Sequence, residues 1–149
     1  GGRFNLMEQK RAKRERGTGL GNMPFLVYVE GPAKHKADQM ADAASVTLSR
    51  MIEAIIDHMP ETVSPGTYGD PAKYRTKDHT GDEILTGLVA PARKAKVKRL
   101  GKLNGGSTSM AQVMNAFITS IRLDPYGLPE WWLDPAAPNY QEALPITGT

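Results

Sequence analysis

The chain has 149 residues, of which 40% are hydrophobic and 23% charged, which is ordinary for one globular domain large enough to bury a core. It contains no cysteine, which excludes disulfides and thiolate metal sites. No apolar stretch reaches the length of a membrane helix, and none follows the basic N-terminal residues, so we expect neither a membrane span nor a secretion signal.

The net charge of +3 is strongly segregated along the chain. Residues 1–22 hold six Lys or Arg against two Glu, residues 93–102 hold six and no acid, and residues 123–149 hold four acids and no base. This pattern favours partners of opposite sign at different places on the surface.

The N-terminal residues 1–22 are predicted to form a basic extended arm. The polar stretch 8–16 is followed by Gly17, Gly19 and Gly21, which would break a helix. The few apolar residues at the start, Phe4, Leu6 and Met7, cannot form a core alone, so we expect them to dock on a neighbour.

Two regular elements are expected next. The β-forming run 25–29 predicts a strand, and Gly31-Pro32 predicts a turn after it. Apolar residues then recur at helical spacing over 37–59, which predicts one amphipathic helix that Pro60 ends; they are Met40, Ala44, Leu48, Met51, Ile55 and Met59. Residues 60–80 are expected to form a long loop, of the kind that is usually functional or ordered by a partner.

In the second half of the chain the strand and the helices are predicted less clearly. Residues 84–88 are compatible with a strand or with the start of a helix. The basic run 93–102, interleaved with small and apolar residues, predicts a short helix whose cations fan over one side. A second amphipathic helix is expected over 107–122, with Ser109 and Gln112 as a capping box. The Pro-rich, acidic residues 124–149 predict an extended tail that lies on a surface.

These elements predict an α+β fold, with a compact domain over 23–123 between the two arms. We expect no catalytic, cofactor-binding or metal-binding residue. The histidines His35, His58 and His79 lack the spacing of metal ligands, and the acidic pairs are typical of solvated faces. The glycine-rich stretches 17–21 and 101–108 depart from nucleotide-binding patterns, and the sorting-type motif 144–148 is interpreted as coincidence.

Partner binding is therefore the expected role, and three alternatives stay open for the basic run and two for the tryptophan pair. The basic run can contact nucleic-acid phosphates or an acidic protein, or it can be a solvated face. Trp131-Trp132 can anchor a partner or pack on this chain's own core. The candidate partner-binding residues are Phe4, Arg11, Lys13, Arg14, Arg93, Lys94, Lys96, Lys98, Arg99, Lys102, Trp131 and Trp132.

One pattern resembles a known family. The helix predicted over 37–59 runs into Pro60, and Thr80-Gly81 with Ile84-Leu85 follow. This resembles the head–tail connector or tail-completion (neck) proteins of tailed bacteriophages. The resemblance implies an α+β subunit of a ring between capsid and tail, without catalytic residues.

The sequence thus predicts a structural assembly protein, a subunit of a large particle such as a phage virion, that binds copies of itself and other structural subunits through its arms. The expected location is the virion or the host cytoplasm, without membrane contact. The alternative is a nucleic-acid-associated protein of ribosomal or nucleoid type that uses basic residues 10–16 and 93–102.

Overall fold

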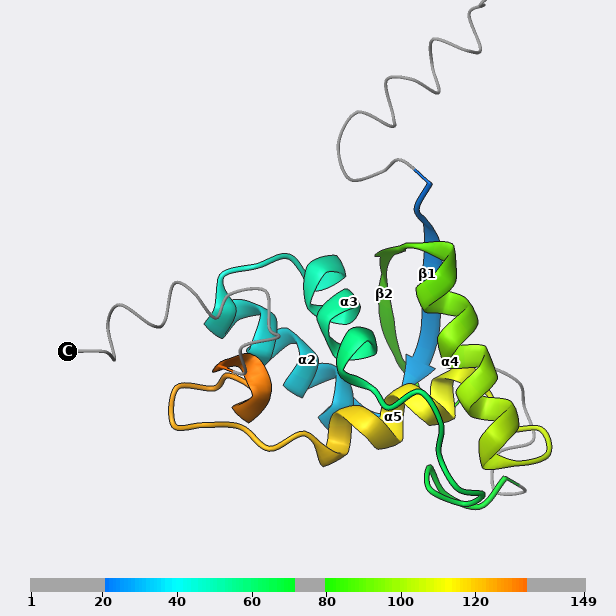
Figure 1. Cartoon of the computed structure of the whole chain (residues 1–149). Helices are drawn as coiled ribbons and strands as arrows, with labels where there is room; N and C mark the ends of the chain where they lie inside the picture. The colour runs from blue at the N-terminus through cyan, green and yellow to red at the C-terminus, as the bar shows by residue number, and fades with distance from the viewer. Residues whose placement is uncertain (1–20, 72–79, 134–149) are drawn as a thin grey trace, which may run out of the picture.

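The structure is a computed structural model that describes residues 21–71 and 80–133. In chain order its elements are β1 (Met23–Val29), α2 (Gly31–Ala44), α3 (Leu48–His58), β2 (Glu83–Val89), α4 (Pro91–Asn104), α5 (Met110–Ser120) and the 3-10 turn η1 (Glu130–Leu133) (Figure 1). Helices combined with an antiparallel sheet confirm the predicted α+β class. No helix within the described ranges is long and apolar enough to cross a bilayer.

β1 and β2 pair antiparallel from Met23 opposite Val89 to Val29 opposite Glu83, and we call this pair the ribbon. The strand predicted over 25–29 is confirmed and begins two residues earlier. Residues 84–88, for which a strand and a helix start were both open, belong to a strand. Phe25, Val27 and Val29 are fully buried, as alternation along a strand with one packed face requires.

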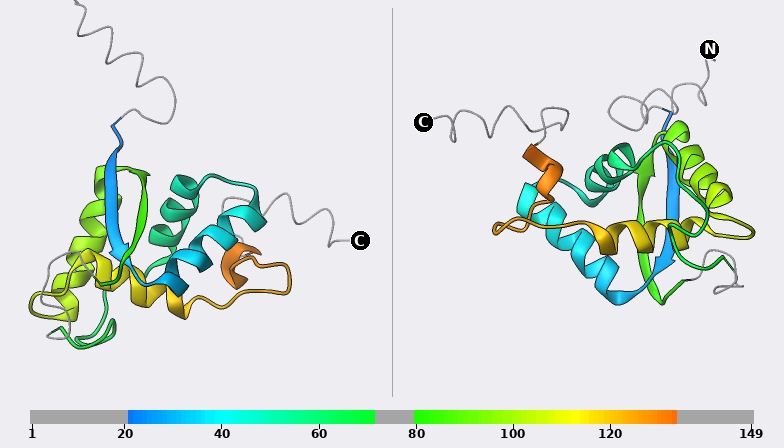
Figure 2. Two further views of the ribbon diagram at one scale, coloured as in Figure 1. Left: turned by 180° about the vertical axis from the view of Figure 1, so that it is seen from behind. Right: turned by 60° about the horizontal axis from the view of Figure 1, so that its bottom comes forward.

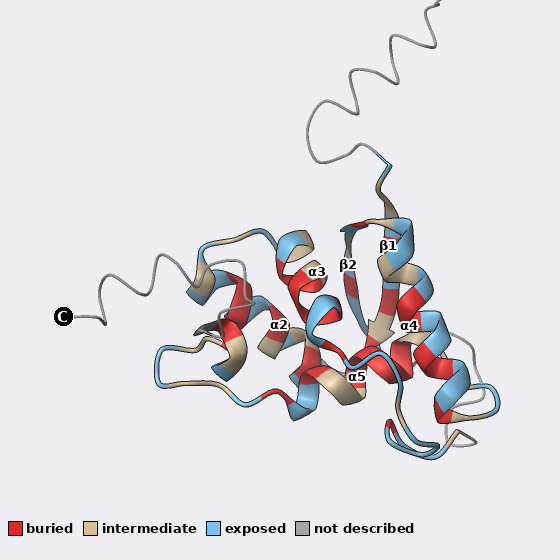
Figure 3. Cartoon of the chain, in the orientation of Figure 1, coloured by how far each residue is buried: buried red, intermediate tan, exposed pale blue. Residues whose placement is uncertain are grey.

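The helices cover one face of the ribbon. α3 packs against β2, α5 packs against β1, and α4 packs on both α3 and α5. Seen from behind, β1 and β2 lie in front of the helices, and none of the helices in the described residues covers them (Figure 2, left). Buried residues gather where the helices face one another and the ribbon (Figure 3). The largest fully buried side chains come from both strands and from α2, α3, α4 and α5: Phe25, Met40, Met51, Ile52, Ile55, Ile56, Leu85, Leu100, Met114 and Ile118.

The single helix predicted over 37–59 is wrong, because the chain forms α2 and α3 with a break at residues 45–47. Ser45 ends α2 in the left-handed conformation, with φ 57°. Its amide donates to the Asp42 carbonyl at 3.1 Å, and the Val46 amide donates to the Ala41 carbonyl at 3.0 Å, which is a Schellman stop. The hydroxyl of Thr47 then caps α3 by accepting from the Arg50 amide at 3.1 Å.

The turn predicted at Gly31-Pro32 is also wrong, since α2 begins there. Proline suits the first turn of a helix because its missing amide proton has no partner at that place. α2 therefore follows β1 with a single residue, Glu30, between them.

The loop after α3 contains no helix or strand in its described part, residues 60–71. The side-chain amides of two buried residues, Asn104 and Gln112, hold this loop in place. The side-chain oxygen Oδ1 of Asn104 accepts from the Tyr68 amide at 2.6 Å, and the side-chain nitrogen Nε2 of Gln112 donates to the Tyr68 carbonyl at 3.0 Å. Ser109 caps α5 as expected, accepting from the Gln112 amide at 3.1 Å, but the Gln112 side chain binds the loop and does not complete a capping box.

The first ten residues of the predicted extended tail are folded onto the domain. The Asp124 carboxylate accepts from the amides of Tyr126 at 2.8 Å and Leu128 at 3.0 Å, and Leu123 bridges Pro129. η1 follows and places Trp132 in the core, 3% exposed. The compact domain therefore continues from the predicted boundary at 123 to residue 133, whereas 134–149, with the motif 144–148, lie outside the described residues.

Candidate protein-binding face

The face of the ribbon that points away from the helices is apolar and open. Leu26, Ile84 and Leu88 are 46%, 43% and 47% exposed, and they are three of the five large hydrophobic side chains exposed among the described residues. The register places Leu26 beside Thr86, Ile84 beside Tyr28 and Leu88 beside Pro24. We call these six residues the outer ribbon face, and none of them carries a charge.

The two edges of the ribbon are partly occupied. On β2 the Leu88 amide donates to the Ser49 hydroxyl at 2.9 Å, and Gly87 permits this approach because a Cβ atom there would lie 2.7 Å from the Ser49 oxygen. On β1 the Pro24 carbonyl accepts from Lys94 at 3.3 Å and the Tyr28 carbonyl accepts from the Thr80 amide at 3.0 Å. Because hydrogen bonds already occupy part of both edges, the face of the ribbon is more accessible for binding than its edges.

An acidic group lies at the end of the ribbon where β1 leaves and β2 begins. Glu83 is opposite Val29, Asp82 precedes it and Glu30 follows Val29; all three carboxylates are in exposed residues. Glu30 accepts from the neutral amide of Asn115 at 3.2 Å. Within residues 21–71 and 80–133, neither Asp82 nor Glu83 forms an ion pair. We call this group the acidic end of the ribbon.

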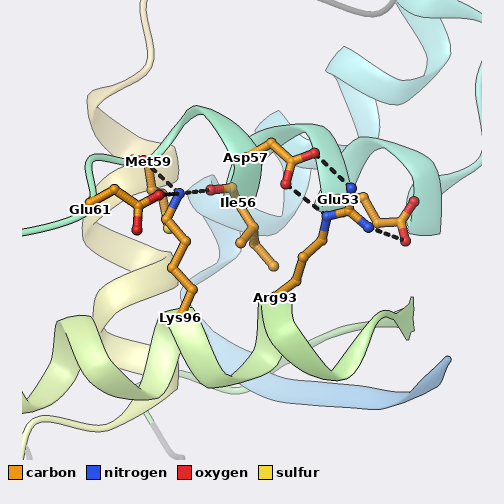
Figure 4. A network of polar contacts seen from close by, with 7 residues as sticks. All are labelled: Glu53, Ile56, Asp57, Met59, Glu61, Arg93 and Lys96. Atoms are coloured by element: carbon orange, nitrogen blue, oxygen red, sulfur yellow. Dashed lines mark hydrogen bonds and ion pairs between the residues drawn. The ribbon is translucent and has the colours of Figure 1, made fainter. Parts of the chain in front are cut away.

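The basic run 93–102 lies in α4, as predicted, but much of its charge is used inside the molecule. Arg93 holds both oxygens of Asp57, at 2.7 Å from Nε and 2.8 Å from Nη2, and its Nη1 contacts Glu53 at 3.1 Å (Figure 4). The hydrogen bond to Asp57, outweighing partial burial, raises the pKa of Arg93. Arg93 therefore joins α4 to α3.

Lys96 contradicts the expectation that the cations of this run fan over an outer side, because it is buried. Its Nζ atom donates to the carbonyls of Ile56 at 2.9 Å and Met59 at 2.7 Å, where α3 ends (Figure 4). Glu61 lies 3.4 Å from this ammonium group and 3.1 Å from Arg99. Lys98 and Lys102 are exposed, and no contact to another described residue engages them.

The two tryptophans lie against this chain's own domain. Trp132 is buried, and Trp131 stacks on His58 with ring centroids 4.3 Å apart and an interplanar angle of 16°. Trp132 is therefore a residue of this chain's own core, which is the second of the two roles expected for the tryptophans. Trp131 remains partly exposed. The other candidate residues, Phe4, Arg11, Lys13 and Arg14, lie outside the described residues, as does His79.

The outer ribbon face is the feature that sequence reasoning missed. A signal for it was present, because the run 25–29 is apolar at every position and not only at alternate ones. Such a run indicates a strand covered on both faces. The helices of the described chain cover only one of them.

No group of three or more His, Cys, Asp or Glu side chains in the described parts of the chain could hold a metal ion. Comparison with models of known protein families, with curated proteins and with solved structures finds no match for this chain.

Proposed function

We propose that this chain is a structural assembly protein, a subunit of a larger particle that binds copies of itself and other structural subunits. The outer ribbon face carries this proposal. Three large aliphatic side chains about half exposed on adjacent strands form a contiguous apolar patch, and such patches are typical of protein-binding sites. If a partner buried this face, both faces of the ribbon would be covered, as the uninterrupted apolar run 25–29 indicates.

The arrangement of α4 supports a protein partner better than the nucleic-acid alternative. Arg93, Lys96 and Arg99 bind acidic groups or carbonyls of α3 and the turn after it. Neutralising phosphates with these residues would first require breaking those contacts. Lys98 and Lys102 remain exposed, which is few cations for a phosphate-binding surface.

The kind of particle is a further part of the proposal. A place in a virion, as a head–tail connector, neck or minor capsid protein, is proposed from the resemblance to connector and neck proteins of tailed bacteriophages. Of the pattern that carries this resemblance, the helix end before Pro60 and the later Thr80-Gly81 and Ile84-Leu85 remain, whereas the long helix is two helices, α2 and α3. A structural subunit of this kind needs no catalytic residue, which agrees with the sequence-based expectation of a chain that is not an enzyme.

Solution mass and shape test the proposal directly. Light scattering and small-angle X-ray scattering on the full chain at low and high salt are expected to show assemblies larger than one chain. The double variant Leu26→Ser/Leu88→Ser should raise the dissociation constant about tenfold or more, because it removes apolar area from the interface. Leu103→Ser is the matched control, since Leu103 is also exposed, at 37%, but lies on α4.

The outcomes separate the two functions. Association that survives high salt and depends on the outer ribbon face supports the proposal. A chain that stays monomeric at all concentrations, or one whose association ignores the ribbon variant, would overturn it. Binding to a nucleic-acid duplex that weakens by orders of magnitude between low and moderate salt would favour the alternative.

A further inference from the structure

Resting on the proposed function, we infer that the outer ribbon face of one copy binds the N-terminal segment of a neighbouring copy. In this contact residues 4–7 lie on the apolar face, and the basic residues of the stretch 8–16 lie against the acidic end of the ribbon. The segment runs in the same direction as β1.

The size of the face fits an extended segment better than a folded domain. Seven residues per strand span roughly 23 Å, and two strands are about 10 Å wide, which gives a few hundred Å². A stable interface between two folded surfaces needs about 800 Å² from each partner. A narrow apolar strip of this length matches one chain segment of about seven residues.

Along the N-terminal segment apolar residues come first and basic residues follow, which matches the order of the apolar face and the acidic end along β1. Phe4 and Leu6 are two residues apart, so an extended backbone points both side chains to the same side. Leu6 and Lys10 are separated by four residues, as are Leu26 and Glu30. A segment parallel to β1 with Leu6 beside Leu26 therefore brings Lys10 level with the acidic end.

Charge supports the same direction. The stretch 8–16 holds five Lys or Arg and two Glu, a net of +3, and the acidic end holds Glu30, Asp82 and Glu83. Asp82 and Glu83, just before and at the start of β2, have no ion-pair partner among residues 21–71 and 80–133. The opposite direction would place the basic stretch beside Pro24 and Leu88, where the Lys94 ammonium group lies 3.3 Å from the Pro24 carbonyl and would repel the basic residues.

Chain length favours a neighbour over the same chain. With residues up to Arg16 at the acidic end, only residues 17–22 remain to return to Met23 at the other end of β1. That return covers roughly 23 Å, whereas a glycine-rich linker of this length has an average span of about 15 Å. A neighbour's segment meets no such constraint, so it binds without stretching the linker.

Cysteine cross-linking tests the contact, and the absence of native cysteine confines the reaction to the introduced residues. Two full chains with different tags, one carrying Leu6→Cys and the other Leu26→Cys, are mixed and treated with a short bismaleimide. We expect a mixed cross-linked dimer, because a segment packed on the face of a sheet keeps its backbone about 10 Å away, which a bismaleimide spans and a direct disulfide, limited to Cα atoms within about 7 Å, does not. The matched control replaces Leu26→Cys with Tyr126→Cys, a site that is 82% exposed and away from the ribbon; it should yield at least fivefold less dimer.

A charge exchange tests the direction. Asp82→Lys/Glu83→Lys should weaken association of the full chain about tenfold, and mixing this variant with Lys10→Glu/Arg11→Glu should restore it. Leu6 cross-linking equally to Leu26 and to Tyr126, or a double-cysteine chain Leu6→Cys/Leu26→Cys that closes only on itself, would overturn the inference. Association that depends on Leu26 and Leu88 but shows no Leu6 cross-link would overturn the inference and leave the proposed function standing, whereas a monomeric chain would remove both.

Discussion

Lys96 stabilises the end of α3 from a different helix. Its ammonium group donates to the carbonyl of Ile56, which also accepts from the Met59 amide at 3.1 Å, and to the carbonyl of Met59, the residue that ends the helix. We predict that Lys96→Met lowers the free energy of unfolding by about 2 kcal/mol, because the aliphatic stem still packs while two buried carbonyls lose a charged donor. Urea denaturation of the full chain measures this.

Lys98→Met serves as the control at the residue scale. Lys98 lies two residues away in the same helix and is exposed, so its replacement should change the free energy of unfolding by less than about 0.5 kcal/mol. Equal effects of the two substitutions would contradict the role of Lys96. The sequence shows the two lysines as equivalent members of one basic run, and only the position of α3 distinguishes them.

At the scale of elements, Ser45 determines where α2 stops. It is the only non-glycine residue with positive φ among residues 21–71 and 80–133, and it occupies the helix-ending position that glycine usually takes. We predict that Ser45→Gly raises the free energy of unfolding by about 0.5–1 kcal/mol, since glycine adopts this conformation without steric strain. Thermal or urea denaturation checks the direction.

Ser64→Gly is the matched control for this element. Ser64 lies in an exposed turn without positive φ, so glycine there gains nothing in the folded state and increases the entropy of the unfolded chain. Stabilisation by Ser64→Gly, or none by Ser45→Gly, would contradict the account. The apolar spacing continues through the break without interruption, which is why the periodicity predicted one helix.

At the scale of the whole molecule, the residues after α5 complete the core. Trp132 is 3% exposed and belongs to the hydrophobic core, although it lies after the last of the long helices in the chain. We predict that Trp132→Ala lowers the free energy of unfolding by about 3–4 kcal/mol, because it leaves a large cavity. Trp131→Ala should lower it by less than about 2 kcal/mol, since Trp131 is only partly buried and stacks on the exposed His58.

Denaturation and solution mass together decide the roles of the two tryptophans. If either were mainly a partner anchor, its replacement would change self-association while leaving the unfolding of the monomer unaffected. A larger loss of stability from Trp131→Ala than from Trp132→Ala would contradict the packing described above.

The sequence by itself determined the α+β class, the strand over 25–29, the second amphipathic helix with its Ser109 cap, and the segregation of charge. These follow from local periodicity and from single residues with strong backbone preferences. Only the tertiary structure decided that Lys96 is internal, that Trp132 is core, that 60–71 is fixed by Asn104 and Gln112, and that one face of the ribbon is open. Each of these depends on which distant segments meet, and a local pattern of polarity is the same whether a side chain finds its partner in this chain, in a neighbouring copy or in water.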